Sequence, residues 1–187
     1  MLETEEMTDN TRRYVEQIAN RTEALKALTE ELFRYSVISS VSDLSYEKVN
    51  VGRVLEDTLI SFYGAFEQKN ITPNISLPDS VIVRILDKSA LSRIFGNIIS
   101  NAVKYSDGDF AVTMTDTGEI TLSNTASELS SVDVGKLFDR FYTVDSARKS
   151  TGLGLSIAKL LTERMGGCIS ADYKGNTLSI MLSFKEG

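Results

Sequence analysis

Three polar side chains fall at helical spacing inside an otherwise apolar segment. Residues 97–106 read NIISNAVKYS, and Asn97, Asn101 and Lys104 share one stripe of the helix that this segment predicts. We call these three residues the amide stripe. One core amide commonly serves only to satisfy backbone groups, but two amides in register with an ammonium indicate a binding site. An amide carbonyl suits Mg²⁺ as a hard oxygen ligand, and the ammonium can hold a phosphate.

Residues 150–161, STGLGLSIAKLL, carry a second signal for phosphate binding. Gly152 and Gly154 allow backbone to approach a ligand closely, and the helix that begins there presents free N–H groups to an anion. Taken alone, the pattern also fits a flexible turn that leads into an amphipathic helix. Beside the amide stripe, it indicates a triphosphate with magnesium. Arg148 and Lys149 suit phosphates, although they fit a solvated surface equally well.

Composition excludes several other kinds of function. The formal charge of -6 argues against a nucleic-acid groove, which needs clustered Lys and Arg. The chain has no histidine and one cysteine, which excludes Ser/His and Cys/His catalysis, ordinary zinc sites and an intramolecular disulfide. That cysteine, Cys168, is expected to be a small core residue. There is no secretory signal and no apolar run of roughly 18 residues, so the sequence predicts a soluble chain without membrane contact.

Residues 1–40 predict a helix that differs in character from the rest of the chain. Asp9 or Asn10 can cap it, and its apolar stripe recurs at three- and four-residue steps. The stripe consists of Val15, Ile18, Thr22, Leu25, Leu28, Leu32 and Tyr35. A stripe this narrow is typical of a coiled coil or bundle and predicts a partner helix, with a plain surface helix as the alternative. The Ser-rich segment 39–45 is interpreted as a hinge.

After this hinge, the sequence predicts helices that alternate with pairs of strands. Helices are expected at 51–70, at 88–106 with Asp87 as its cap, and at 154–165 before Gly166 and Gly167. Strand pairs are expected at 72–77 with 80–86, 109–115 with 119–125, and 168–174 with 177–184, and residues 126–150 are expected to be irregular. This order indicates an α+β fold in which helices cover one face of a mixed, mostly antiparallel sheet.

Three motifs here resemble those of sensor histidine kinases. NIISNAVKYS resembles the N box, LFDRFY at residues 137–142 the F box, and TGLGLSIAKLL the second glycine box, and their order and spacing also match. The resemblance implies a two-layer ATP-binding catalytic domain of the Bergerat (GHKL) type over residues 41–187. Residues 1–40 resemble the second helix of the family's dimerisation and histidine-phosphotransfer hairpin, which is coiled-coil-like.

The resemblance also implies roles for individual residues. Asn101 would be the magnesium ligand, Asn97 a polar partner of the phosphates or metal, and Lys104 a phosphate contact. Tyr105 would lie near the ribose and phosphates, and Thr177 matches a position where the family often places a hydroxyl near adenine.

A mobile lid over ATP is implied as well. Its base would consist of Gly152, Leu153, Gly154 and Leu155. The aromatic residues of the F box, Phe138, Phe141 and Tyr142, would anchor its other end.

One motif departs from the family pattern. The first glycine box of the family usually reads D-x-G-x-G, whereas this chain has NTASE at residues 124–128. Asn124 therefore replaces the aspartate, and Ala126 and Glu128 replace the glycines. An Asn carbonyl can still accept a hydrogen bond from the adenine amino group, although a neutral acceptor makes a weaker bond than a charged one. We expect a loop of different shape and a site that still binds nucleotide.

The missing histidine is the larger departure. In the family the phosphoacceptor histidine lies on the first helix of the hairpin, so the resemblance implies that this chain is a fragment that cannot phosphorylate itself. Its function would be transfer of the ATP γ-phosphate to a histidine-bearing helix of the full-length protein, for relay to an aspartate of a response regulator. A cytoplasmic location, a membrane-anchored parent and a homodimer through the N-terminal helix are also implied.

Two other classes of function remain open from the sequence. One is a related Bergerat-type serine kinase or ATP-gated switch, against which the F box and the hairpin-like first helix argue. The other is a degenerate interaction module that binds no nucleotide, which NTASE suggests. Nucleotide binding distinguishes the interaction module from the other two.

Overall fold

The computed structural model describes residues 8–39, 44–129, 134–142 and 151–186. The chain divides into two compact units, Met1–Ser42 and Asp43–Gly187. Among the described residues, the first unit holds one long helix and the second holds all the strands.

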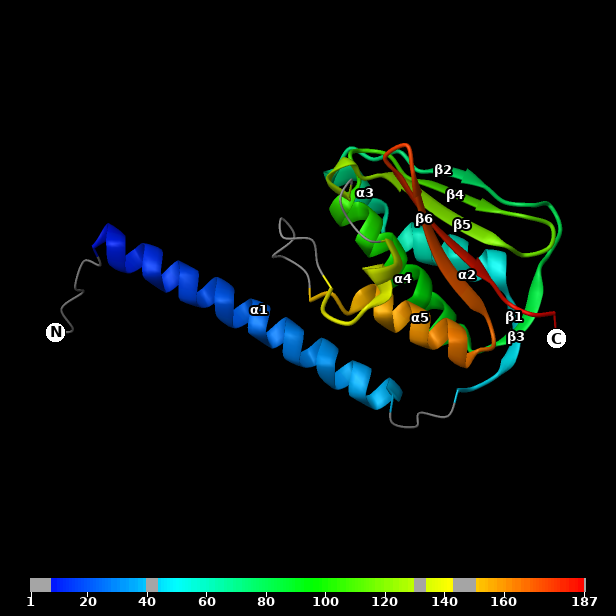
Figure 1. The fold of residues 1–187 in the computed structure, drawn as a ribbon, viewed down its shortest axis with the longest axis horizontal. Helices are drawn as coiled ribbons and strands as arrows, with labels where there is room; N and C mark the ends of the chain where they lie inside the picture. The colour runs from blue at the N-terminus through cyan, green and yellow to red at the C-terminus, as the bar shows by residue number, and fades with distance from the viewer. Residues whose placement is uncertain (1–7, 40–43, 130–133, 143–150, 187) are drawn as a thin grey trace. The chain divides into compact units, whose positions relative to one another are not determined.

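The helix of the first unit, α1, spans Asp9–Ser39 (Figure 1). The Thr8 Oγ1 accepts a hydrogen bond from the Thr11 N–H at 3.3 Å. Thr8 therefore caps the helix, and the expectation that Asp9 or Asn10 does so is wrong, because both lie within the first turn. None of the helices in the described ranges combines the length and apolar character needed to cross a membrane.

The structure describes only part of the apolar stripe of α1. Val15, Ile18 and Leu25 are exposed within this unit. The side chains of Leu28, Leu32 and Tyr35 lie outside the described part. The described apolar residues of α1 therefore have no covering layer within the first unit.

The second unit is built on a five-stranded sheet with the order β2-β4-β5-β7-β6. The strands are β2 (Asn74–Ser76), β4 (Ala111–Met114), β5 (Ile120–Thr125), β6 (Cys168–Lys174) and β7 (Thr177–Ser183). The strand β2 runs parallel to β4, and every other pairing in this sheet is antiparallel. The predicted hairpins β4–β5 and β6–β7 are confirmed, and the second turns at Gly175 and Asn176, both with positive φ.

Helices cover one face of this sheet (Figure 1). They are α2 (Val51–Ser61), α4 (Lys88–Tyr105) and α5 (Gly154–Arg164). The central helix α4 buries Leu91, Ile94, Phe95, Ile98 and Ile99. On β5 every second residue is buried, so the same face of the sheet meets the helices. Two layers with one core follow, as the sequence predicts.

One predicted hairpin does not form. Instead of pairing with β2, strand β3 (Val83–Leu86) pairs antiparallel with β1 (Glu47–Asn50) in a separate two-stranded sheet. The strand β2 instead extends the large sheet beside β4. The strand β1 was not predicted, because its four residues carry too short a pattern. The nearby Pro-Asp turn signal indicated a local partner for β3 instead.

The helix predicted at 51–70 is interrupted. It consists of α2 and a short helix α3 (Tyr63–Gln68), separated at Phe62, whose φ is -95° and ψ 1°. The Ser61 Oγ donates to the Thr58 carbonyl at 2.6 Å, one turn back, where the first helix ends.

Within the predicted irregular stretch 126–150, the described parts form two short 3₁₀ helices, η1 (Ser127–Leu129) and η2 (Val134–Phe138).

A buried arginine joins the small sheet to the large one. Arg84, on β3, donates to the carbonyl oxygens of Thr117 at 2.7 Å, Val83 at 2.9 Å and Phe184 at 3.3 Å. The carboxylate of Glu186 lies 3.5 Å from the same guanidinium. These contacts hold the β4–β5 turn and the end of β7 against β3.

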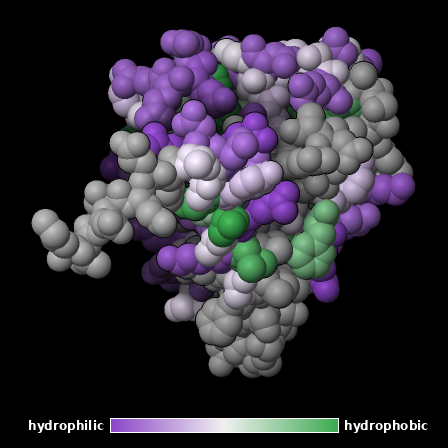
Figure 2. All heavy atoms as spheres, turned by 90° about the vertical axis from the view of Figure 1, so that its left-hand side faces the viewer, coloured by the Kyte–Doolittle hydropathy of each residue, from purple (hydrophilic) through white to green (hydrophobic). Residues whose placement is uncertain are grey.

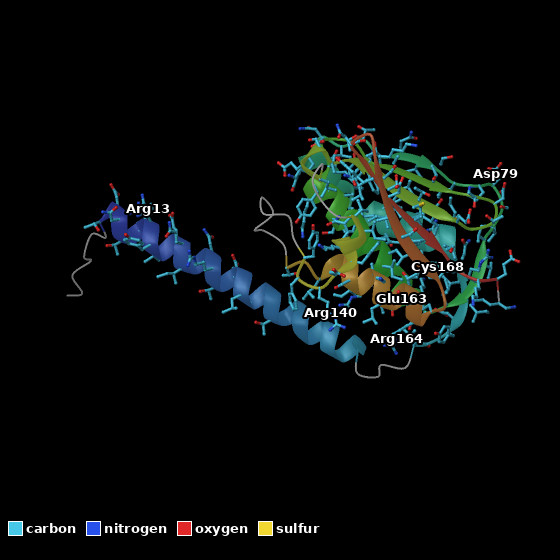
Figure 3. The ribbon with its side chains drawn as sticks, viewed as in Figure 1. Arg13, Asp79, Arg140, Glu163, Arg164 and Cys168 are labelled. Atoms are coloured by element: carbon cyan, nitrogen blue, oxygen red, sulfur yellow. The ribbon has the colours of Figure 1, made fainter. Side chains whose placement is uncertain are left out.

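Cys168 is exposed, so its expected place in the core is wrong. It begins β6, the edge strand of the large sheet, directly after the end of α5 that carries Glu163 and Arg164 (Figure 3). Alternate residues of this edge strand are exposed. Among the coloured residues that Figure 2 draws, hydrophilic side chains predominate.

Candidate functional site

The helix that carries the amide stripe is fixed at its first residue. The Asp87 Oδ1 accepts hydrogen bonds from the Ser89 Oγ at 2.7 Å and the Ala90 N–H at 2.8 Å, and Oδ2 accepts from the Ser45 N–H at 2.9 Å. Burial alone raises the pKa of Asp87, but these hydrogen bonds outweigh it and lower the pKa below its ordinary value of 3.8. Asp87 is thus an ionised N-cap, as predicted, that also ties the start of the unit to α4.

Asn97 has an unused donor. Its Nδ2 is buried and has no hydrogen-bond partner among the described residues. A buried donor without a partner costs about 1–3 kcal/mol. Asn97 faces the first residue of α5, because a Cβ built on Gly154 would lie 3.9 Å from the Asn97 Oδ1. A side chain at position 154 would therefore occupy the space beside this amide.

The remaining stripe residues occupy the last turns of α4. Asn101 is half-buried, one turn after Asn97, and Lys104 is exposed in the final turn. Tyr105 is half-buried at the last residue of the helix. The helix thus presents an amide donor, an amide and an ammonium in order toward its C-terminal end, as the spacing predicts.

Residues 152–155, which we call the glycine segment, contact the F box through the backbone. The Phe141 N–H donates to the Gly152 carbonyl at 3.1 Å. Gly152 has a φ of +68°, and a Cβ there would lie 2.7 Å from the carbonyl carbon of Phe141. Only glycine fits this position. Phe141 and Gly152 therefore meet from opposite sides of the segment 143–150. Arg148 and Lys149 belong to that segment and lie outside the described residues.

The hydrophobic members of these motifs have different roles from one another. The side chains of Leu153 and Leu155 are buried in the core, where they fix the start of α5. Phe138 is half-buried with the Lys159 ammonium 5.7 Å above its ring. Phe141 is 54% exposed with a positive φ of 61°, so its anchoring contact is made by its backbone and not by core packing.

Asn124 lies in the helix-facing series of β5 and is 5% exposed. Its Nδ2 donates to the Thr125 carbonyl at 3.1 Å. This bond leaves Oδ1 as the atom that can accept a further hydrogen bond.

The NTASE segment is held by its backbone. The Ala126 N–H donates to the Asn176 carbonyl at 2.8 Å, and the Ser127 N–H donates to the Asp107 Oδ2 at 2.8 Å. Ala126 and Glu128 do not have the positive φ that would require glycine. The loop begins as the 3₁₀ helix η1.

The sequence reasoning missed two aspartates at this end of the sheet. Asp107 and Asp109, in the turn after α4, bond the backbone of Thr125 and Ser127. The turn sequence SDGD was the available signal, since Ser and Asp commonly bond nearby backbone N–H groups.

Thr177 is not placed beside Asn124. The strands β5 and β7 pair so that Thr125 lies opposite Thr177 and Asn124 opposite Leu178. Side chains alternate along a strand, so Thr177 lies on the other face of the sheet from Asn124. The register therefore does not bring the Thr177 hydroxyl to the Asn124 amide.

Comparison with known proteins identifies the family. Residues 86–186 match the family described as histidine kinase-, DNA gyrase B- and HSP90-like ATPases. The chain belongs to this family. Sensor protein VanSC of Enterococcus gallinarum is 32% identical over 177 residues, which cover 89% of this chain and 48% of VanSC. Sensor histidine kinase WalK of Bacillus subtilis (strain 168) is 31% identical over 189 residues, which cover 93% of this chain and 31% of WalK.

The chain spans about half or less of the length of these relatives. Among solved structures, full-length ShkA in complex with AMPPNP matches with a TM-score of 0.72 at 20% identity, over 97% of this chain and 40% of ShkA, which shows the fold. The predicted α+β ATPase fold is confirmed. Residues 86–186 are an ATP-binding catalytic domain of the sensor histidine kinase type, and the alternatives of a serine kinase and an interaction module are not favoured.

Proposed function

We propose that this chain binds Mg²⁺-ATP between the end of α4, the glycine segment and the end of β5, and transfers the γ-phosphate to a histidine. The unpartnered Nδ2 of Asn97, beside the start of α5, carries this proposal. No described residue replaces the hydrogen bonds to water that the Asn97 Nδ2 loses on burial, and a bound phosphate or water would replace them. Family membership supplies the nucleotide.

The residues fit a magnesium triphosphate. No group of three or more His, Cys, Asp or Glu side chains that could hold a metal occurs in the described ranges. Magnesium does not require such a group, because it commonly takes one or two protein oxygens together with substrate phosphates. The Asn101 carbonyl is the protein oxygen that we assign to it. When bound, magnesium neutralises charge on the phosphate oxygens.

The other site residues orient the nucleotide. Lys104 offsets phosphate charge, Asn97 donates its free N–H to a phosphate or a water, and Asn124 accepts a hydrogen bond from the adenine amino group. The backbone N–H groups at the start of α5 face an anion, and Gly154 leaves space beside Asn97. Tyr105 contacts the ribose-phosphate side. Such positioning and charge stabilisation account for most of the catalysis of phosphoryl transfer.

The nucleophile must come from outside this chain, which contains no histidine. We propose that residues 1–40 act as the second helix of a dimerisation and phosphotransfer hairpin, that residues 41–187 are the catalytic domain, and that a histidine-bearing helix of the full-length protein receives the phosphoryl group. An aspartate of a response regulator would then accept it. Homodimerisation through α1 completes the proposal.

Calorimetric titration with a non-hydrolysable ATP analogue, with and without Mg²⁺, tests the site. We expect magnesium-dependent binding by the wild type and its loss in Asn101→Ala, which removes the proposed magnesium ligand. Asn124→Ala should weaken binding roughly tenfold or more, since it removes the buried acceptor for the adenine amino group. Asn74→Ala, at an exposed asparagine of the edge strand β2, is the matched control and should bind as the wild type does.

Two results would contradict the proposal. If the folded wild type binds no nucleotide at millimolar nucleotide concentration, the interaction module becomes the better hypothesis. Binding without phosphorylation of an added histidine-bearing hairpin, but with phosphorylation of a serine in a partner, would favour the serine kinase.

A further inference from the structure

The orientation of the Asn124 amide is set by its neighbour along the strand. The Nδ2 donates to the Thr125 carbonyl at 3.1 Å. A carbonyl oxygen only accepts hydrogen bonds, so the NH₂ of the amide must face it and Oδ1 must face away. Without this bond an asparagine could turn either its donor or its acceptor toward a ligand.

Thr125 is in turn held by hydrogen bonds to residues of the turn after α4, and we call these contacts the clamp. The Asp109 Oδ1 accepts from the Thr125 N–H at 2.7 Å, and Oδ2 accepts from the Thr125 Oγ1 at 2.8 Å. The Asp107 N–H donates to the Thr125 carbonyl at 2.9 Å. This carbonyl therefore accepts hydrogen bonds from both Asn124 and Asp107. The exposed Asp109 side chain therefore binds both the backbone N–H and the hydroxyl of Thr125.

The clamp suits an ionised carboxylate. Burial would raise the pKa of Asp109, but hydrogen bonds from the Thr125 N–H and Oγ1 and from the Ser106 Oγ, at 3.1 Å, outweigh burial and lower the pKa. A carboxylate accepts through both oxygens at once, which matches the two donors of Thr125.

We propose that Asp109 is a positioning residue for base recognition, which acts through Thr125 to hold the Asn124 amide with Oδ1 toward the base, so that the site selects adenine over guanine. This inference rests on the proposed nucleotide-binding function. The family's aspartate is an acceptor in any rotamer, whereas an asparagine needs an orienting contact. The network from Asp109 to Asn124 supplies that contact in this chain.

The selectivity follows from hydrogen-bond chemistry. Adenine presents its 6-amino group as a donor, which Oδ1 can accept, whereas guanine presents the O6 acceptor at the same position. With the amide held, guanine would leave two acceptors facing each other in a desolvated site. We expect the wild type to bind an ATP analogue at least about tenfold more tightly than the matching GTP analogue.

The first test uses the protein without nucleotide. In ¹H–¹⁵N spectra of wild type, the Asn124 side-chain NH₂ should be shifted from the position of exposed asparagines and protected from exchange, because it is buried and hydrogen-bonded. Asp109→Ala should move this signal toward the exposed position, and Asp109→Asn should largely restore it, since an amide can accept from the Thr125 N–H and donate to Oγ1. Asp116→Ala is the matched control: Asp116 is an exposed aspartate at the opposite end of the β4–β5 pair, bonded to the Ser80 Oγ at 3.0 Å.

The second test measures dissociation constants for the two analogues. In Asp109→Ala the adenine-to-guanine preference should fall about fivefold, with Thr125→Val intermediate and Asp109→Asn close to wild type. The Asp107 N–H still holds the Thr125 carbonyl in these variants, so the preference should narrow and not vanish. Asp116→Ala should leave it unchanged.

The outcomes separate the inference from the function beneath it. If Asp109→Ala weakens both analogues equally, or leaves the Asn124 signal in place, Asp109 has only a structural role and the inference is overturned. A wild type that binds neither analogue overturns the inference together with the proposed function.

Discussion

Gly152 shows how tightly a single position can be constrained at this site. It combines a positive φ with a close approach to the backbone of Phe141, and its carbonyl accepts the Phe141 N–H. A substitution meets both a conformational and a steric barrier. The contact it would break is the one that joins the F box to the start of α5.

We expect Gly152→Ala to lower the free energy of unfolding by about 1–3 kcal/mol and to weaken nucleotide binding, because an L-residue is strained at this φ and its Cβ would overlap backbone. Urea unfolding and calorimetric titration measure the two effects. Gly64→Ala in α3 is the control, since nothing lies within 4 Å of a Cβ there. Equal stability of the two variants would show that the Phe141–Gly152 contact is dispensable.

At the residue scale, the sequence revealed side chains that break a pattern. Asn97 and Asn101 stand out within an apolar helix. Asp109 lies in a polar turn, and its hydrogen bond to the Thr125 N–H depends on the fold and cannot be seen in the sequence. The face occupied by Thr177 depends on strand register, which the sequence of one strand does not specify.

At the scale of elements, α4 depends on its cap. The pKa of Asp87 is lowered on folding, so the stability it contributes is fully present above its ordinary value of 3.8 and is lost as the pH falls through the lower folded pKa. Asp109 has a pKa lowered in the same direction and adds to the same loss in acid.

We expect Asp87→Ala to lower the free energy of unfolding at neutral pH by about 1–2 kcal/mol through loss of the cap. The difference from wild type should shrink as the pH falls from 3.8 through the lower folded pKa of Asp87, because the carboxyl binds its proton more readily in the unfolded chain. Urea unfolding across this pH range measures it, with Asp172→Ala at an exposed position of β6 as control. A difference that stays constant with pH would contradict the assignment.

The elements that were predicted correctly have local signals. A cap and an apolar period define α4, and short turns define the β4–β5 and β6–β7 hairpins. The pairings of β2 and β3 were missed because each has a partner distant in sequence, and β1 has only four residues. The break at Phe62 also escaped detection, because the apolar pattern continues through it.

At the scale of the whole molecule, α1 presents apolar side chains that its own unit does not bury. Val15, Ile18 and Leu25 are exposed within its unit at coiled-coil spacing. We expect the chain to self-associate through α1, or this helix to fray, because an isolated amphipathic helix is marginally stable in water. Sedimentation over a range of concentrations measures association.

Ile18→Lys should weaken that association, because it places a charge in the apolar stripe. Asn20→Lys, on the opposite side of α1, should leave association unchanged. A strict monomer with a fully ordered α1 at every concentration would contradict the expectation.

The exposure of Cys168 has a practical consequence for such measurements. It is the sole thiol of the sequence, and it begins β6 at the end of the β6–β7 hairpin opposite to Asn176. Two chains can therefore become cross-linked under oxidising conditions and imitate a helical dimer, unless a reductant is present. The same thiol offers a single attachment point for a maleimide fluorophore, remote from the NTASE loop, without any substitution in the chain.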